Sequence, residues 1–299
     1  MKHLLDLESL DGTAITQLLD RAARCKAGEL RPVGQAPVKA RVANLFFEAS
    51  TRTRTSFEIA ERALGLEVVS LAVQASSVQK GESLRDTTET LLAMGIRLVV
   101  IRHAASGAAA YVARRTVAQV VNAGDGQHEH PTQALLDAFT LRERWGSLAG
   151  KTVTIIGDVR HSRVARSNLQ GLKKLGVGVR LFGPRALVPR ELGAEIAETW
   201  DEAVRGTDAL MMLRLQRERM EQGFLPDLGD YRRGFGLTEA RERALPAHVL
   251  VLHPGPMNRG VEIDDSVADG PRSLIATQVT NGVFVRMAVL ASLLEEPQS

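Results

Sequence analysis

Residues 42–65 read VANLFFEASTRTRTSFEIAERALG, an apolar run, a polar turn and then an amphipathic segment. The run from Val42 to Phe47 predicts a buried β-strand, because it is continuous, short and rich in β-branched and aromatic residues. The following apolar positions recur with helical spacing and predict a helix that Gly65 ends: Ser56, Phe57, Ile59, Ala60, Ala63 and Leu64. A strand that feeds directly into a helix is the repeating unit of an α/β fold.

The turn between this strand and this helix, Ser50 to Arg54, concentrates hydroxyl and guanidinium groups. Backbone N–H groups at a helix N-terminus lack partners, and the helix dipole favours an anion there. Hydroxyls and a bidentate arginine at the same place suit a phosphate dianion. The turn therefore predicts a phosphate cradle, in preference to a capped helix beside a solvated basic turn.

The same alternation of strand and helix continues along the chain and predicts an α/β fold of two doubly wound domains. Their sheets are expected to be mainly parallel, and helices are expected to link them. The expected strands lie near residues 42–47, 67–72, 97–102, 117–121, 152–156, 178–182, 208–213 and 248–252.

The domain boundary is expected along a helix that begins at Pro131 and ends near Gly146, after which Lys151–Asp158 starts a new strand and turn. A final helix over residues 283–294 is expected to cross back to the first domain. This predicts one domain from residues 1–131 and 277–299 and another from residues 132–276. Residues 222–245 are rich in Gly and Arg without a clear period and are expected to form a mobile loop.

Length and charge bound the class of protein. A chain of 299 residues suits two domains, and a single cysteine, Cys25, excludes an intrachain disulfide. No apolar run approaches the roughly 20 residues that cross a bilayer, and no signal peptide is evident. A cytoplasmic protein is therefore expected, with no membrane partner.

Arginine outnumbers lysine by 31 to 7, although the net charge is only +3. Arginine recognises carboxylate and phosphate in a bidentate way, so small anionic substrates are indicated. A nucleic-acid partner is not expected, because the chain has no recognised motif and only two Trp and two Tyr for base stacking.

Four further segments join the cradle, and together they resemble the aspartate/ornithine carbamoyltransferase family over nearly the whole chain and in the same order. They are Lys80-Gly-Glu-Ser-Leu-Arg-Asp-Thr87, Arg102-His103, His130-Pro-Thr-Gln133 and His253-Pro-Gly-Pro256. The Ser-Thr-Arg-Thr-Arg and His-Pro-Thr-Gln segments occur throughout this family, and they imply carbamoyl phosphate as the donor.

The acceptor is implied by the second half of the chain. The stretch from Met212 to Arg219 resembles the aspartate branch, and the chain lacks the His-Cys-Leu-Pro and Ser-Met-Gly elements typical of the ornithine branch. The resemblance thus implies carbamoyl transfer to the α-amino group of L-aspartate, an early step of pyrimidine (UMP) biosynthesis. Transfer to ornithine or another amino acid is the alternative.

The resemblance implies a set of residues for each of three parts of the donor: the phosphate, the carbonyl oxygen and the NH₂ group. Ser50, Thr51, Arg52 and Thr53 would hold the phosphate with Lys80, while Thr53, Arg102 and His130 would face the carbonyl oxygen, which gains charge in the transition state. The NH₂ end would meet Gln133 and the Pro254, Gly255 and Pro256 turn. Arg52, Thr53, Lys80, Arg102 and His130 are the expected catalytic residues.

The acceptor brings two carboxylates. Arg163 is expected to bind the α-carboxylate, whereas Arg214 and Gln216, two apart on a strand-like segment, would bind the β-carboxylate. Lys80 is a further expected aspartate contact. No side chain stands out as the base, so the departing phosphate would accept the proton of the amine.

The resemblance also implies that Ser76 and Lys80 reach the site from a neighbouring subunit, and hence a homotrimer with shared active sites. Regulatory or dihydroorotase chains remain open as additional partners. No cofactor is expected.

Two segments suggest other kinds of site. Ile155-Ile156-Gly157-Asp158 ends a strand as a dinucleotide-binding turn does, but residues 159–162 contain no glycine, so the G-x-G-x-x-G pattern fails. His128-Glu129-His130 suggests a metal site, but no cysteine pair or third histidine at ligand spacing completes it. No metal is expected.

Overall fold

The computed structural model describes residues 1–29, 40–71, 81–216 and 227–295, and it divides into two compact units. Unit 1 comprises Met1–Phe139 and Val279–Ser299, and unit 2 comprises Thr140–Gln278. Both divisions fall inside helices, namely α5 (Pro131–Trp145) and α11 (Ile275–Glu295). The boundaries predicted from the sequence, after residues 131 and 276, fall in the same two helices.

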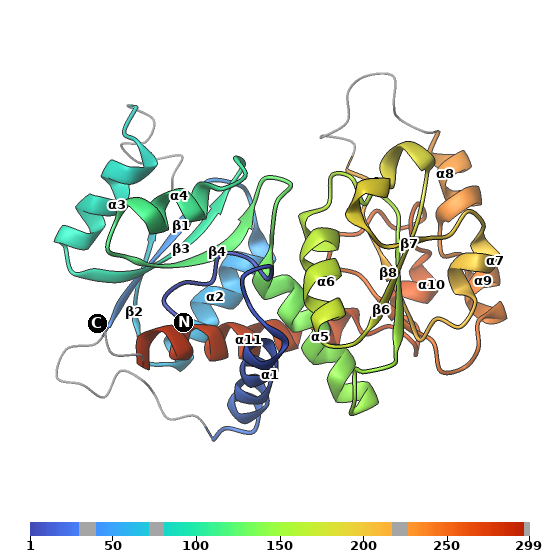
Figure 1. Cartoon of the computed structure of the whole chain (residues 1–299), viewed down its shortest axis with the longest axis horizontal. Coiled ribbons are helices and arrows are strands. Elements are labelled where there is room, and N and C mark those ends of the chain that lie inside the picture. The colour runs from blue at the N-terminus through green and yellow to red at the C-terminus, as the bar shows by residue number, and fades with distance from the viewer. Residues whose placement is uncertain (30–39, 72–80, 217–226, 296–299) are drawn as a thin grey trace. The chain divides into compact units, whose positions relative to one another are not determined.

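Unit 1 contains a sheet of parallel strands in the order β2-β1-β3-β4 (Figure 1). Adjacent strands in the sequence are joined by helices, as a parallel sheet requires. In chain order the elements before α5 are α1 (Gly12–Lys26), β1 (Arg41–Phe46), α2 (Thr51–Ala63), β2 (Glu67–Leu71), α3 (Leu84–Ala93), β3 (Ile96–His103), α4 (Ala108–Arg115) and β4 (Gln119–Asp125).

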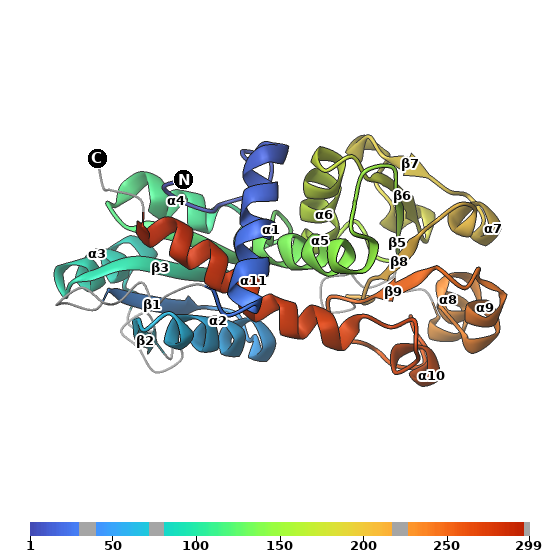
Figure 2. The ribbon, with the colours of Figure 1, turned by 90° about the horizontal axis from the view of Figure 1, so that it is seen from below.

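Helices cover both faces of this sheet. One face contributes Leu45, Ile101 and Val120 to a buried cluster that includes residues of α3 and α4. Because side chains alternate along a strand, Asn44 lies on the other face, where its side-chain amide donates to Glu61 of α2. Figure 2 shows α4 and α2 on opposite sides of the strands. Burial on both faces explains why these strands read as continuous apolar runs.

Helix α11 is long and apolar enough to cross a membrane by length and composition, which the sequence analysis did not anticipate. Packing accounts for its apolar character, since residues such as Val289, Leu290 and Leu293 are buried in unit 1. It also carries a buried arginine, Arg286, and its last residue, Glu295, pairs with Arg21 of α1. These contacts are those of a core helix.

Unit 2 contains a second sheet of parallel strands in the order β7-β6-β5-β8-β9, and Figure 2 shows α6 and α10 on opposite sides of it. After α5 the elements are β5 (Thr152–Ile156), α6 (Arg163–Lys174), β6 (Gly178–Phe182), the 3₁₀ turns η3 (Arg185–Leu187) and η4 (Arg190–Leu192), β7 (Glu195–Ile196), α7 (Trp200–Val204), β8 (Ala209–Met212), α8 (Leu228–Phe235), α9 (Glu239–Ala244), β9 (Leu250–Leu252) and α10 (Asp265–Ala268).

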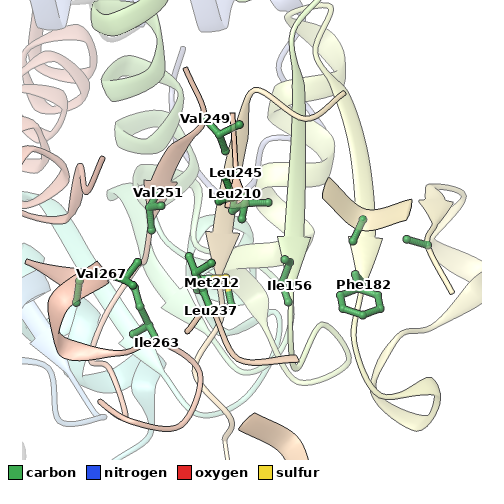
Figure 3. Close-up of a cluster of buried hydrophobic side chains, with 13 residues drawn as sticks. Ile156, Phe182, Leu210, Met212, Leu237, Leu245, Val249, Val251, Ile263 and Val267 are labelled. Carbon is green, nitrogen blue, oxygen red and sulfur yellow. The ribbon is translucent and has the colours of Figure 1, made fainter. Parts of the chain in front are cut away.

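A buried apolar cluster supports one face of this second sheet. Ile156, Met212 and Val251 project from neighbouring strands towards residues of the segments around α9 and α10 (Figure 3). The cluster fixes the carboxyl ends of β5, β8 and β9 relative to one another, because each strand contributes a side chain near its end.

The expected α/β class with mainly parallel sheets is confirmed, and each predicted strand overlaps an observed one. Only the two-residue β7 was not predicted among the strands of the described residues. The expected mobile loop is wrong for residues 227–245, where α8 and α9 form. Asp227 and Thr238 cap the two helices, and the fully buried Tyr231 anchors α8, so local capping and one aromatic outweigh the Gly-rich composition. Residues 222–226 of that prediction lie outside the described residues.

Candidate active site

In unit 1, three neighbouring strands bring the predicted donor-binding residues to one edge of the sheet. Parallel strands end on the same side, and Phe46 of β1 lies in register with Arg102 of β3. His103 of β3 in turn lies in register with Asp125, the last residue of β4. The cradle and the loop that leads to His130 therefore follow β1 and β4, and Arg102 lies at the carboxyl end of β3 between them.

The sequence predicted the cradle as the turn that precedes the helix, but residues 51–54 of it form the first turn of α2. Ser50 is the N-cap and Thr51 is the first helical residue. The Ser50 side chain makes no capping hydrogen bond, whereas Ser83 and Ser162 each cap their own helices. The Ser50 hydroxyl is thus not used to cap α2, and first-turn N–H groups of a helix are a favourable place for an anion.

The side chains of this turn differ in exposure. Thr51 and Arg52 are exposed, and Thr53 is buried. Arg54 is committed elsewhere, since its Nε lies 3.0 Å from Oε1 of Glu58, one helical turn later. The Arg54 side chain is also 44% exposed, so it is this ion pair, and not burial, that leaves Arg52 as the guanidinium of the cradle proposed to meet a ligand.

Arg102 is held at its strand end by two oxygens. Its Nε lies 3.4 Å from Oε2 of Glu48, the residue that follows Phe47 after β1, and its Nη1 donates to the carbonyl of Ala123 at 3.3 Å. Both charged side chains are largely buried, with 14% and 20% exposed. Glu48, which the sequence analysis missed, compensates the Arg102 charge and limits its orientations.

His130 is buried, and its carbonyl accepts from the backbone N–H of Gln133 at 3.0 Å at the start of α5. The loop that delivers it is shaped by Asp125, which the sequence analysis also missed. Oδ1 of Asp125 accepts from the amide of Asn122 at 2.8 Å and from the N–H of Glu129 at 3.1 Å. The predicted helix-start position of His130 is thus confirmed.

His128 extends from the same loop, and its Nδ1 lies 3.2 Å from Oδ2 of Asp125. Within residues 1–29, 40–71, 81–216 and 227–295, no group of three or more His, Cys, Asp or Glu side chains is arranged to hold a metal ion.

In unit 2, the predicted acceptor-binding residues likewise follow neighbouring strands. β8 lies between β5 and β9 in the sheet. Arg163 follows β5 as the first residue of α6, Arg214 and Gln216 follow β8, and the Pro254–Pro256 turn follows β9. All of these residues therefore come to the carboxyl edge of one sheet, where ligands of open α/β sheets bind.

Arg214 and Gln216 do not lie on a strand, because β8 ends at Met212. The alternation on which the prediction rested nevertheless holds, since both residues are partly exposed and Leu215 between them is buried. Arg163 itself is largely buried, behind the N-cap Ser162, whose hydroxyl accepts from the N–H of Ala165 at 3.1 Å.

A buried carboxylate, Asp158, joins the loops after β5 and β8. Its Oδ1 accepts from Nδ1 of His161 at 2.9 Å, and its Oδ2 lies 3.4 Å from the N–H of Gln216. The Gln216 side chain in turn donates to the carbonyl of His161 at 3.2 Å. Asp158 and His161 were missed as site residues, and they position Gln216 from both its backbone and its side chain.

The turn after β9 is shaped by His253. The N–H of Gly255 donates to its Nδ1 at 2.9 Å, and the Gly255–Pro256 peptide bond is cis. Pro254 and Gly255 are partly exposed at this edge.

Gly157, which suggested a dinucleotide-binding turn, is required by packing. Its φ is +126°, and a Cβ there would lie 2.8 Å from the hydroxyl of Tyr231 and 3.0 Å from the carbonyl of Leu213. The glycine thus admits α8 and the segment after β8, and no dinucleotide is needed to explain it.

Ser76 and Lys80, predicted to come from a neighbouring subunit, lie outside the described residues. Every other predicted site residue falls at one of the two strand edges or in the first turn of the helix that follows.

Comparison with known families gives two matches that together span most of the chain. A model described as "Aspartate/ornithine carbamoyltransferase, carbamoyl-P binding domain" matches residues 2–143. A second, described as "Aspartate/ornithine carbamoyltransferase, Asp/Orn binding domain", matches residues 149–293.

Individual relatives match over nearly their full length. The aspartate carbamoyltransferase catalytic subunit of Gemmatimonas aurantiaca is 54% identical over 294 residues, which are 97% of this chain and 92% of that protein. Aspartate transcarbamoylase of Trypanosoma cruzi, solved with carbamoyl phosphate and aspartate, is similar with a TM-score of 0.87 at 32% identity, over 98% of this chain and 96% of that one.

A third similar protein differs in its acceptor. Ornithine carbamoyltransferase of Thermus thermophilus gives a TM-score of 0.86 at 28% identity, over 99% of both chains. The backbone fold is thus common to enzymes named for two different acceptors, so the similarity of folds does not identify the acceptor. The higher sequence identity, 54%, is with an aspartate carbamoyltransferase.

Proposed function

The chain belongs to the aspartate/ornithine carbamoyltransferase family, and from this membership we propose how its residues carry out the reaction. The reaction is transfer of the carbamoyl group of carbamoyl phosphate to the α-amino group of L-aspartate, giving N-carbamoyl-L-aspartate and phosphate. The observation that carries this function is the 54% identity over 97% of the chain with an aspartate carbamoyltransferase catalytic subunit.

The phosphate group is assigned to the first turn of α2. Ser50, Thr51 and Thr53 supply hydroxyls, Arg52 supplies a guanidinium, and the first-turn N–H groups supply fixed dipoles. The support for this assignment is the N-cap hydroxyl that caps nothing. As the bond between the carbonyl carbon and the bridging oxygen breaks, these donors stabilise the charge that accumulates on phosphate without reorganising.

The carbonyl oxygen of the donor is assigned to Thr53, Arg102 and His130. This oxygen becomes negative when the amine attacks and a tetrahedral intermediate forms, so donors already aimed at it lower the barrier. The support is that all three residues lie at or just after the carboxyl ends of adjacent, parallel strands of one sheet. The NH₂ group is assigned to Gln133 and, in unit 2, to carbonyls of the Pro254, Gly255 and Pro256 turn.

The acceptor is assigned to the strand edge of unit 2. Arg163 takes the α-carboxylate, and Arg214 with Gln216 takes the β-carboxylate. The support is the network around Asp158, which holds Gln216 by its N–H and by its side chain. The departing phosphate accepts the proton that the attacking amine loses.

The assembly and the cellular role are inferred from family membership. We assign the chain to a cytoplasmic homotrimer in which Ser76 and Lys80 of a neighbouring subunit complete each site, and to an early step of pyrimidine biosynthesis. Regulatory or dihydroorotase chains remain open as partners. Measurement of the mass of the purified protein by light scattering tests the trimer, and a monomer with full activity contradicts shared sites.

The acceptor is tested by supplying carbamoyl phosphate with either aspartate or ornithine to the purified protein. N-Carbamoyl-L-aspartate is the expected product. The side chain of ornithine ends in an ammonium group and not in a carboxylate. Preferential turnover of ornithine would therefore contradict the assignment of Arg214 and Gln216 and favour the alternative acceptor.

A further inference from the structure

The side chain of Gln133 is held by a carboxylate one turn later on the same helix. Its Nε2 donates to Oδ1 of Asp137 at 2.9 Å. Both side chains are buried, Asp137 completely and Gln133 with 8% of its surface exposed. An amide and a carboxylate at positions i and i+4 of α5 face the same side of the helix, so this contact is built into the sequence.

The identity of the partner fixes which way the Gln133 amide faces. An ionised carboxylate only accepts hydrogen bonds, whereas a side-chain amide carries one accepting end and one donating end. The NH₂ end of Gln133 must therefore face Asp137, and its oxygen must face away from it. A neutral partner able to donate would permit either orientation.

Arg286 of α11 provides the opposite charge. Only 3% of its surface is exposed, and its guanidinium carbon lies 5.0 Å from the centre of the Phe57 ring in α2. Burial lowers the pKa of Arg286 to about 10, and the charge of Asp137 acts to raise it. Arg286 thus stays protonated at neutral pH, and the two buried charges compensate each other.

The fold makes room for this arginine. Gly282 lies one turn before Arg286 on α11, and a Cβ at Gly282 would come 2.5 Å from Nη1 of Arg286 and 3.2 Å from Cδ2 of Leu136 on α5. A larger residue would displace the guanidinium or separate it from α5.

We propose that Asp137 and Arg286 are positioning residues that fix the Gln133 amide with its oxygen towards the NH₂ group of carbamoyl phosphate, and that they thereby select a carbamoyl donor over an acyl one. This inference rests on the proposed contact of Gln133 with the donor. Arg286 keeps Asp137 as an acceptor, Asp137 holds the NH₂ end of Gln133, and the Gln133 oxygen accepts from the donor.

The selectivity follows from the chemistry of the two donors. Acetyl phosphate has the size of carbamoyl phosphate but carries a methyl group in place of NH₂. When carbamoyl phosphate binds, its NH₂ group donates a hydrogen bond to the fixed Gln133 oxygen. When acetyl phosphate binds, its methyl group displaces water from that oxygen and offers no hydrogen bond in return. A Gln133 amide free to turn over would lose this discrimination.

The test compares dissociation constants of carbamoyl phosphate and acetyl phosphate, measured by competition with inorganic phosphate. Asp137→Asn keeps the size of the side chain but can donate as well as accept, so either orientation of Gln133 becomes possible. We expect the preference for carbamoyl phosphate to fall by roughly tenfold, which is the worth of one well-oriented hydrogen bond, with the dissociation constant of inorganic phosphate unchanged. Asp20→Asn, at an exposed carboxylate of α1 in the same unit, is the matched control and should keep the wild-type preference.

Gln133→Met, which removes the amide, sets the preference expected when this contact is absent. If Gln133→Met loses the preference and Asp137→Asn retains it, Asp137 does not position Gln133 and the proposal is overturned. If Gln133→Met keeps the preference, Gln133 does not read the NH₂ group, and the proposal is again overturned. A parallel weakening of both donors in Asp137→Asn indicates a structural role only and also contradicts it.

Arg286 is tested by Arg286→Lys, which retains the charge and should retain most of the preference, and Arg286→Met, which removes the charge and should shift the preference towards that of Asp137→Asn. Equal preferences in Arg286→Lys and Arg286→Met contradict the role of its charge. Binding needs no turnover, so the ratio of the two dissociation constants tests only the positioning of Gln133 by Asp137 and Arg286. Absence of N-carbamoyl-L-aspartate in the wild-type assay instead contradicts the proposed function.

Discussion

Oε1 of Glu262 lies 3.3 Å from Nε2 of His253, and both side chains are completely buried. Nδ1 of His253 accepts from the N–H of Gly255, so the ring carries its proton on Nε2 and donates it to Glu262. The same Oε1 accepts from the N–H of Asn258 at 2.5 Å, and the side chain of Asn258 donates to the carbonyl of Leu215 at 3.3 Å. Glu262 therefore connects the turn after β9 with the segment that holds Arg214 and Gln216.

Replacing Glu262 by alanine should destabilise the protein. The buried Nε2 of His253 would be left without an acceptor, at roughly 1–3 kcal/mol, and the part-buried N–H of Asn258 would lose its acceptor too. Glu262→Gln keeps an acceptor oxygen and should fall between the wild type and Glu262→Ala in thermal unfolding. If Glu262→Ala unfolds at the wild-type temperature, water replaces the carboxylate and the connection is unimportant for stability.

The buried Glu61 predicts a specific dependence of stability on pH. Burial raises its pKa from an ordinary value of 4.5 to about 7, although the amide of Asn44 opposes this by donating to Oε2 at 2.8 Å. The folded state then binds the proton of Glu61 more tightly than the unfolded state does. Its contribution to stability is present below about pH 4.5 and is lost as the pH rises towards 7, on the order of 3 kcal/mol.

Glu61→Gln, neutral at every pH, should therefore gain stability relative to the wild type between pH 5 and pH 8. Unfolding temperatures of both proteins at the two pH values measure this gain. Glu58 on the same helix provides a control, because the hydrogen bond from Ser70 lowers its pKa. The stability difference between Glu58→Gln and the wild type should therefore stay constant from pH 5 to pH 8 and change only below about pH 4.5. A constant difference between Glu61→Gln and the wild type would mean that Glu61 titrates normally in the folded state.

The fold could be predicted because periodicity and apolar runs are local properties of the chain. β1 and α2 were evident from residues 42–65 alone, since burial on both faces of a parallel sheet leaves a continuous apolar run. α8 and α9 were missed because they are short, and their stability depends on capping and on burial of Tyr231 against distant residues. Composition alone does not contain that information.

The candidate ligand-binding residues were predictable because they lie in compact motifs at strand ends, whereas the carboxylates that hold them were not. Glu48, Asp137 and Glu262 act through contacts that only the tertiary structure or a specific helix face reveals. Asp125 and Asp158 carry a readable signal, because each begins an Asp-x-x-His sequence at a strand end and each accepts from the histidine three residues later. That repeated spacing could have identified both as residues that shape the loops.

Arg52→Ala should weaken binding of inorganic phosphate about 10- to 100-fold, because a hydrogen bond to a charged group contributes roughly 1.5–3 kcal/mol. Arg52→Lys, which keeps the charge without the bidentate geometry, should show an intermediate loss. Titration calorimetry measures both. Arg62→Ala, at an exposed arginine in the last turn of the same helix, should bind phosphate like the wild type. Equal losses of phosphate affinity in Arg52→Ala and Arg62→Ala would mean that Arg52 acts only through general electrostatic attraction and does not contact the phosphate.

Arg214→Ala should impair use of aspartate far more than binding of carbamoyl phosphate. Loss of one charge-assisted partner of the β-carboxylate raises the KM for aspartate about 10- to 100-fold, while the donor, bound through α2, keeps its dissociation constant. Asparagine, which lacks the β-charge, gives a second measurement, because the preference of the enzyme for aspartate over asparagine should shrink in Arg214→Ala. Arg205→Ala, at an exposed arginine of the same unit, should retain both the KM and the preference. Equal weakening of aspartate and carbamoyl phosphate would show that Arg214 supports the fold of the strand edge and does not bind the acceptor.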